Sequence, residues 1–247
     1  VVQLYARDEE ASVGRPILEL VGFRRVSLAP GERVSVSFHL WSEQFAYTGI
    51  DYRRVVEPGG KLPVTFVRDV GQVPLTYRHH PSGGRSQWKG DYVDGTVAPL
   101  WPFGFGRSYT SFEVSNLRAD RSQVPTDGGE LVVTVEVANV GDRPGDEVVQ
   151  LYARDEEASV GRPILELVGF RRVSLAPGER VSVSFHLWSE QFAYTGIDYR
   201  RVVEPGGIGL SVGTSSADLP LTARVELVGP VVEVIARRRY VTESSLG

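Results

Sequence analysis

The chain has 247 residues, a formal net charge of -4 at pH 7, and neither cysteine nor methionine. Hydrophobic residues make up 41% and aromatic residues 10% of it, which is enough for a packed core, while the small charge of mixed sign predicts no nucleic-acid partner and no membrane partner. Without cysteine there is no disulfide framework, thiolate nucleophile or cysteine-ligated zinc site, and no apolar run approaches the roughly 20 residues of a membrane helix.

The chain opens with a segment that it later repeats. Residues Val1–Gly60 recur without change as Val148–Gly207, and the identity ends where Lys61 stands against Ile208. Two copies with separate roles would be expected to differ on their solvent faces, so the identity indicates a recent duplication, an engineered one or an assembly error. Because Val1 reads as the middle of a strand and methionine is absent, we expect the sequence to be a piece of a longer reading frame.

Strand-type alternation of apolar and polar residues dominates the unrepeated part and the second copy. Leu131–Val137 and Val181–Leu187 alternate clearly, and each predicts a strand with one buried face. Turn signals separate further predicted strands, at Phe112–Leu117, Val148–Ala153, Phe170–Leu175, Ile208–Val212 and Leu221–Leu227. Seven short strands without amphipathic helices predict an all-β fold, an antiparallel sandwich over residues 105–229.

The same pattern divides the chain into four parts. Residues 1–60 are expected to form an incomplete duplicate half-sandwich, 61–104 an irregular linker, 105–229 the complete sandwich, and 230–247 a C-terminal tail. We interpret the basic run Arg237–Arg239 in that tail as solvated.

Several spaced motifs carry a resemblance to a known family. Glu147–Tyr152, Arg162-Pro163, Gly169-Phe170, Leu175–Glu179 and Glu204–Gly206 occur in one order that resembles the C-terminal fibronectin type III-like domain of family 3 glycoside hydrolases, the β-glucosidases and β-xylosidases. Gly59–Phe66 and Pro102–Thr110 resemble the end of that family's α/β sandwich domain and its link into the terminal domain. The resemblance implies that residues 61–104 are a remnant of that α/β domain and a linker, and that residues 105–229 form a sandwich of the fibronectin type III or immunoglobulin type. Arg107 departs from the leucine that is more common there.

The resemblance implies a structural role rather than catalysis by this chain. Retaining glycosidases need two carboxylates about 5 to 5.5 Å apart, and in this family they lie on upstream domains. We therefore assign no catalytic residue, no cofactor and no metal, and we interpret the acidic runs Asp8–Glu10 and Asp155–Glu157 as solvated turns. The catalytic domains of the parent enzyme are the expected partner, and that bacterial enzyme is expected to be periplasmic or secreted.

One stretch is rich in aromatic residues and offers a candidate carbohydrate-contact surface. Its candidates are Tyr77, Trp88, Tyr92 and Trp101, because rings with polar tips suit sugar stacking at a wet site. An interdomain packing segment is the favoured interpretation of this stretch, and a carbohydrate-binding module that takes an oligosaccharide is the alternative. A third alternative, an adhesion-type tandem sandwich protein, needs two complete domains. The adjacent His79 and His80 are interpreted as a solvated loop pair.

Two copies of one half-domain compete for a single set of partner strands in residues 111–140. Pairing with the first copy closes a longer loop, which costs only about 2 kcal/mol more in free energy than pairing with the second copy. The second copy continues into Ile208–Leu227, and the burial of apolar residues there should make pairing with the second copy the more stable arrangement. The first copy would then keep open sheet edges and could form a homo-oligomer through them. We expect a stable core over 105–229, with early proteolysis or fast amide exchange within 1–104.

Overall fold

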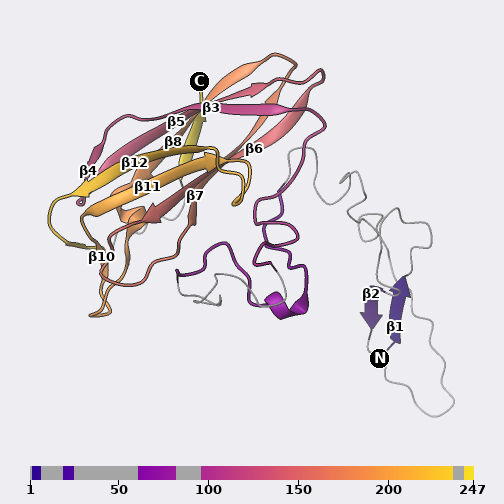
Figure 1. Ribbon diagram of the computed structural model, residues 1–247, viewed down its shortest axis with the longest axis horizontal. Coiled ribbons are helices and arrows are strands. Elements are labelled where there is room, and N and C mark those ends of the chain that lie inside the picture. The colour runs from indigo at the N-terminus through magenta and orange to yellow at the C-terminus, as the bar shows by residue number, and fades with distance from the viewer. Residues whose placement is uncertain (1, 7–18, 25–60, 82–95, 236–241) are drawn as a thin grey trace, which may run out of the picture. The chain divides into compact units, whose positions relative to one another are not determined.

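The structure is a computed structural model that describes residues 2–6, 19–24, 61–81, 96–235 and 242–247 (Figure 1). The chain divides into two compact units, Val1–Glu57 and Pro58–Gly247, and each is described by itself. The described part is built from strands and two short 3-10 helices, η2 (Val70–Gln72) and η3 (Ser189–Phe192), which confirms the predicted all-β class. None of its helices is long and apolar enough to cross a membrane.

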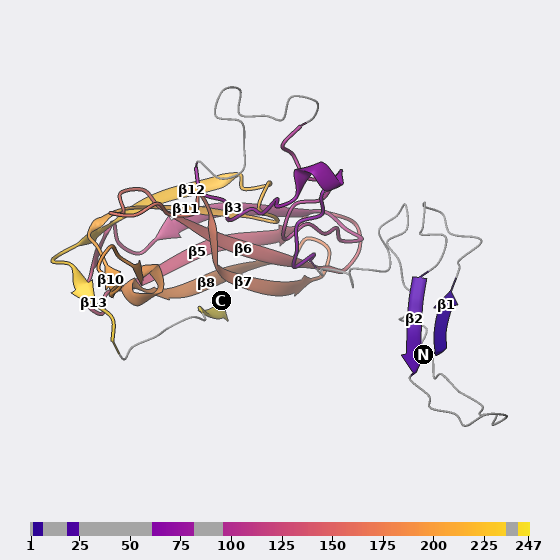
Figure 2. The ribbon, with the colours of Figure 1, turned by 90° about the horizontal axis from the view of Figure 1, so that it is seen from below.

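Two antiparallel sheets packed face to face make up the sandwich of the second unit (Figures 1 and 2). One sheet has the order β4-β12-β11-β6-β7 and the other the order β14-β8-β5-β3, and only the β4–β12 pair is parallel. The strands of the first sheet are β4 (Gln123–Pro125), β6 (Gly145–Asp155), β7 (Glu166–Leu175), β11 (Gly206–Gly213) and β12 (Leu221–Val228). Those of the second are β3 (Phe112–Ala119), β5 (Glu130–Asn139), β8 (Arg180–Trp188) and β14 (Glu243–Leu246).

The core lies between these two sheets, where the alternating residues of the predicted strands meet. Within one sheet, Leu131 of β5 lies beside Leu187 of β8 and Val133 lies beside Phe185, and these four residues are buried together with Val135 and Val137. Strand β6 is buried along most of its length, since β7 and β11 flank it and the other sheet covers it. Each of the seven predicted strands is present, and most run one to four residues longer than predicted.

Residues 230–247, expected to be a tail, contribute two strands. β13 (Val232–Glu233) pairs with β10 (Arg201–Val203), which also pairs with β9 (Tyr194–Thr195). β14 pairs antiparallel with β8 and forms one edge of the four-stranded sheet. These strands are short, and β14 consists mostly of polar residues, so they carry no alternation that periodicity could detect. The basic run at 237–239 lies outside the described residues.

The first unit contains a hairpin of β1 (Val2–Ala6) and β2 (Glu19–Arg24). Its pairing repeats the last five rows of the β6–β7 ladder, Val149↔Arg171 to Ala153↔Glu166. Even the register shift recurs, between Leu4 and Tyr5 as between Leu151 and Tyr152. The identical sequence therefore forms the same local structure, and the remainder of the predicted half-sandwich lies outside the described residues.

The partner strands combine with the second copy, as predicted. β5 pairs with β8 over nine rows from Glu130↔Trp188 to Ala138↔Arg180, and β11 pairs with β6. β11 and β12 continue directly from the second copy and add buried residues, among them Ile208, Val225 and Leu227.

Candidate interdomain joint

Residues 61–81 and 96–104 form a small folded piece ahead of the sandwich. Backbone hydrogen bonds join its two halves, from Phe66 N to Trp101 O (2.9 Å) and from Leu100 N to Phe66 O (2.8 Å). The buried Gln72 side chain, at the end of η2 (Val70–Gln72), donates to the carbonyl oxygens of Thr96 (2.7 Å) and Ala98 (3.2 Å). The segment is irregular, with one isolated bridge and one short 3-10 helix, and these hydrogen bonds hold it together.

A buried ion pair attaches the start of this segment to the sandwich. Lys61 Nζ lies 2.6 Å from Glu147 Oε1, and the two side chains are only 9% and 8% exposed. The same ammonium group donates to the carbonyl oxygen of Gly106 (3.2 Å). Backbone bonds on either side, from Leu62 N to Phe105 O and from Gly104 N to Leu62 O (both 2.8 Å), hold this contact in register.

Gln150, in the middle of β6, forms hydrogen bonds both with the segment and with a loop of the sandwich. Its amide nitrogen donates to the carbonyl oxygens of Gly104 (2.9 Å) and Thr214 (2.6 Å), while its oxygen accepts a hydrogen bond from the Tyr152 hydroxyl (2.6 Å). Gly104 has a φ of 76°, and a Cβ there would collide with the Gln150 side chain. A glycine is therefore required for the backbone to approach β6 this closely.

Aromatic packing fills the space beside Gln150. The Tyr77 ring stacks on Phe103, with centroids 4.3 Å apart, and meets Tyr152 edge-on at 5.8 Å. Burial raises the pKa of Tyr77 and that of the fully buried Tyr152, because each phenolate would have to lose its water. Both hydroxyls therefore stay protonated across the physiological range.

The candidate carbohydrate contacts are only partly described by the structure. Tyr77 packs against Phe103 and Tyr152, while Trp101 meets Phe66 edge-on with centroids 5.4 Å apart. Both rings are half-buried and make contacts inside the second unit. Trp88 and Tyr92 lie outside the described residues, so the proposed sugar surface stays a prediction.

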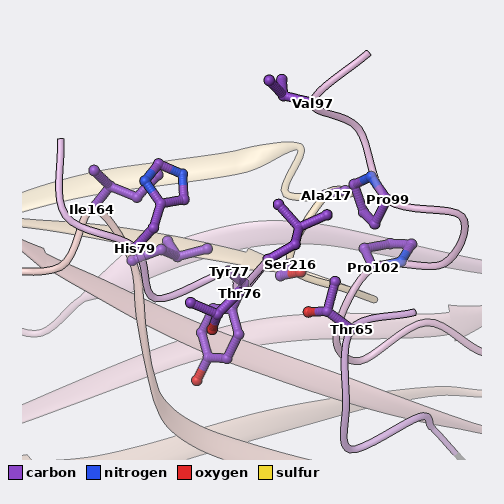
Figure 3. Close-up of a pocket in the computed structure, with 12 residues that line it drawn as sticks. Thr65, Thr76, Tyr77, His79, Val97, Pro99, Pro102, Ile164, Ser216 and Ala217 are labelled. Carbon is purple, nitrogen blue, oxygen red and sulfur yellow. The ribbon is translucent and has the colours of Figure 1, made fainter. Parts of the chain in front are cut away.

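A shallow hollow of about 170 Å³ opens where the segment meets two sandwich loops (Figure 3). The segment contributes Tyr77, His79 and Pro102 to its walls, and the sandwich loops contribute Ile164 and Ser216. The lining is mainly apolar, with hydroxyl groups of Thr65, Thr76 and Ser216 beside it. His79 Nδ1 donates to the carbonyl oxygen of His80 (2.9 Å), and within the described ranges no three acidic, histidine or cysteine side chains are grouped for a metal ion.

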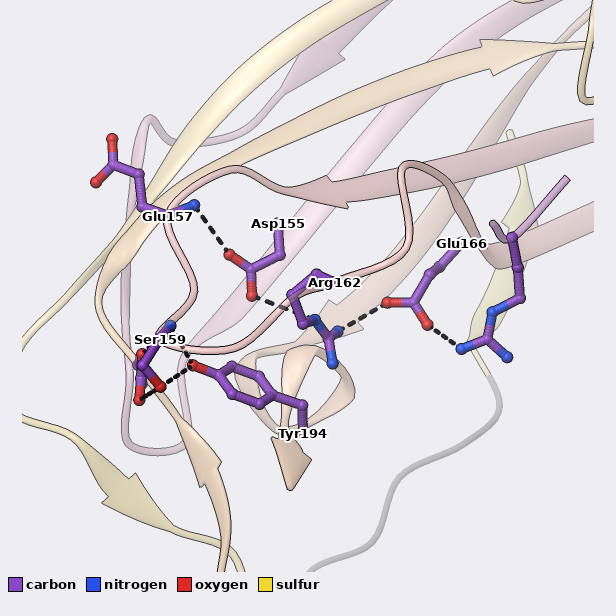
Figure 4. A network of polar contacts seen from close by, with 8 residues as sticks. Asp155, Glu157, Ser159, Arg162, Glu166 and Tyr194 are labelled. Atoms are coloured by element: carbon purple, nitrogen blue, oxygen red, sulfur yellow. Dashed lines mark hydrogen bonds and ion pairs between the residues drawn. The ribbon is translucent and has the colours of Figure 1, made fainter. Parts of the chain in front are cut away.

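A second attachment is a chain of charged side chains (Figure 4). Arg78 of the segment contacts the Glu166 carboxylate, which Arg162 also reaches at 2.7 Å. The Arg162 guanidinium extends to Asp155 (3.6 Å) and lies 4.6 Å from the centre of the Tyr194 ring. A backbone hydrogen bond from Ile164 N to His79 O (3.0 Å) also joins the segment to the sandwich.

The structure corrects the interpretation of Asp155 as part of a solvated turn. Its side chain is 13% exposed, since it ends β6 and faces Arg162, whereas Glu156 and Glu157 are exposed and pair with Arg224. Burial raises the pKa of Asp155 even though Arg162 opposes that shift. Burial therefore outweighs the ion pair at this carboxyl.

Asp155→Asn is expected to change how stability depends on pH. A carboxyl whose pKa is raised by folding favours the folded state below its unfolded pKa of about 3.9, and that contribution is lost as pH rises through the folded pKa. Asparagine does not titrate, so the variant keeps the same contribution at every pH. The free energy of unfolding of the variant minus that of wild type should therefore increase from acidic to neutral pH. Urea denaturation across that range measures the difference, and a decrease instead would mean that Arg162 outweighs burial.

The second unit is thus a two-sheet antiparallel sandwich joined tightly to a preceding segment, which defines a fibronectin type III-like domain. The sequence matches the fibronectin type III-like domain family over residues 1–62 and 147–216, and the chain belongs to that family. It is 48% identical over 161 residues to a β-xylosidase of Formosa agariphila, and 38% identical over 166 residues to the periplasmic β-glucosidase of Salmonella typhimurium. Each alignment covers 65% of this chain and 22% of the relative.

The chain is also similar to solved structures of β-glucosidases. A β-glucosidase from Erythrobacter marinus superimposes with a TM-score of 0.64 at 46% identity, covering 69% of this chain and 22% of that one. The Listeria innocua β-glucosidase in complex with glucose gives 0.63 at 38% identity, covering 70% and 25%. The chain therefore spans about a quarter or less of these proteins, and its recognition as the C-terminal region of a family 3 glycoside hydrolase is confirmed.

Proposed function

We propose that the second unit is an accessory region that supports the catalytic domains of a family 3 β-glucosidase or β-xylosidase without reacting with substrate itself. The sandwich would hold the end of the preceding α/β domain in one position. A family 3 active site uses residues of more than one upstream domain, so fixing one of these domains would preserve the spacing of the two carboxylates.

The buried Lys61–Glu147 ion pair is the observation that carries this proposal. Lys61 belongs to the segment that resembles the end of the α/β domain, and Glu147 belongs to β6 of the sandwich. A flexible linker would have no need to bury two opposite charges, because their desolvation is offset only by fixed geometry and further hydrogen bonds. Lys61 and Glu147 meet both conditions through Gly106 and Val148.

Complementation of a truncated relative tests the proposal. A family 3 β-xylosidase cut ahead of the region that matches this chain is mixed with the chain, and binding is followed by sedimentation and hydrolysis by release of nitrophenol from an aryl xyloside. We expect neither partner to be active alone and the mixture to be active. A Lys61→Met chain, in which the contact with Glu147 is broken, serves as the control and should restore less activity.

Two outcomes would contradict the proposal. Hydrolysis by this chain alone would make it an enzyme in its own right. Absence of binding to the truncated β-xylosidase, with the sandwich folded, would remove the supporting role.

A further inference from the structure

The repeated strand occupies an interior position in one unit and an edge position in the other. In the sandwich, β6 lies between β7 and β11, and its rows from Gln150 to Asp155 pair with β11. In the first unit, β1 has the sequence of residues 149–153 of β6 and pairs with β2 in a sheet of two strands. Among the described residues, nothing takes the place of β11 beside β1.

The chain itself explains why β11 has no counterpart there. The second copy continues into Ile208 and β11, whereas the first copy continues into Lys61, where the repeat ends. Lys61 and Leu62 belong instead to the joint, which is the contact of residues 61–81 and 96–104 with the sandwich. The N–H and C=O groups that β6 shares with β11 thus have no equivalent partner strand following the first copy.

The sandwich protects its own edges, which makes the contrast with β1 sharper. β4 is only three residues long and ends at Pro125, and β3 carries a register shift next to Asn116, whose φ is 56°. At the β7 edge, the Thr242 hydroxyl donates to the Val168 carbonyl oxygen, and Arg171 donates to the Ser244 carbonyl oxygen. Short strands, prolines, bulges and covering segments are the devices that prevent edge-to-edge association.

Strand β1 has none of these devices in its sequence. Val2–Ala6 contains no proline, glycine or charge, because it repeats a strand whose residues Val149, Leu151 and Tyr152 are fully buried. A two-stranded hairpin is marginally stable in water, and three or more strands are needed for independent stability. A sequence suited to the centre of a sheet is therefore left at an edge that gains from another strand.

We infer that β1 pairs with β1 of a second copy of this chain. An antiparallel pair of identical strands obeys a two-fold axis, so one surface serves both partners and the contact closes at a dimer. The resulting order β2-β1-β1-β2 has four strands and gives each β1 the second neighbour that β6 has in β11. In every chain β11 is already paired with β6 and cannot supply this neighbour, whereas β1 of a second copy has the same open edge among the described strands.

Sedimentation and engineered cross-linking test this inference. The natural chain contains no cysteine, so single-cysteine variants Gln3→Cys, Leu4→Cys and Tyr5→Cys report on one contact without background. At least one of the three should form a disulfide-linked dimer on mild oxidation, because residues near the axis face their own counterparts. Phe170→Cys, at an exposed side chain of β7 in the sandwich, is the matched control and should stay monomeric.

Wild type should also sediment as a concentration-dependent dimer. Leu4→Lys, which sets like charges against each other across the axis, should weaken dimerisation several-fold and leave thermal unfolding of the sandwich unchanged. Phe170→Lys should leave dimerisation intact. A monomer at all concentrations would overturn the inference, and so would a dimer that Phe170→Lys disrupts and Leu4→Lys does not.

Discussion

Phe185→Ala is expected to lower the free energy of unfolding of the second unit by about 3–5 kcal/mol, whereas Phe38→Ala should leave that unit unchanged. The two residues are the same position in the two identical copies, so their sequence surroundings are the same. Phe185 is fully buried between the sheets, where β8 pairs with β5. The difference between the variants therefore measures which copy supplies the sandwich core.

Amide exchange followed by mass spectrometry can assign the effect to one unit. Peptides from β3 and β5 occur once in the chain, so their protection reports on the sandwich alone. Phe185→Ala should increase exchange in both peptides, and Phe38→Ala should not. Equal effects of the two variants would mean that both copies compete for β5 in solution.

Amide exchange also tests the predicted difference in stability between residues 1–104 and residues 105–229. The expectation placed a stable core at 105–229 and rapid exchange within 1–104. The structure moves the start of the stable region ahead of residue 105, because backbone hydrogen bonds of Leu62, Phe66 and Gly104 make residues 61–81 and 96–104 part of the second unit. The amides of these residues should therefore exchange more slowly than the fast rate that the sequence predicts for 1–104.

Sequence periodicity identified the long strands because each has an alternating face that must be buried. β5 and β8 have nine to ten residues, and their valines, leucines and phenylalanine alternate with polar residues. β9, β10 and β13 have two or three residues, too few for any period to emerge. β14 is recognisable only through its pairing with β8, a contact that the local sequence does not contain.

The joint was harder to predict for a different reason. Lys61 and Glu147 are far apart in sequence, and a lysine or glutamate is ordinarily exposed, so nothing local indicates that they form a buried pair. The ring of Tyr77 makes it a candidate sugar contact in the sequence, but its contacts with Phe103 and Tyr152 depend on the fold. Gly104 belongs to a motif that carried the family resemblance, and its approach to Gln150 gives that motif a physical reason.

Lys61→Met is expected to destabilise the second unit by about 3–5 kcal/mol, because it leaves the Glu147 carboxylate buried without its cation. Glu147→Leu should have a similar effect by leaving Lys61 unpaired. The double variant should recover much of the loss, since two apolar side chains can fill the space of a buried ion pair at little net cost. Urea denaturation of the four proteins gives the coupling free energy as a double-mutant cycle.

Arg143→Met supplies the matched control for this cycle. Arg143 pairs with Asp142 at 3.2 Å, but the side chains are 62% and 84% exposed, so water screens the pair and its removal should leave stability unchanged. The comparison separates the charge of Lys61 from its burial. If Lys61→Met proved as mild as Arg143→Met, water would have to reach the joint, and the segment would be held by Gln150 and the Tyr77 ring rather than by the ion pair.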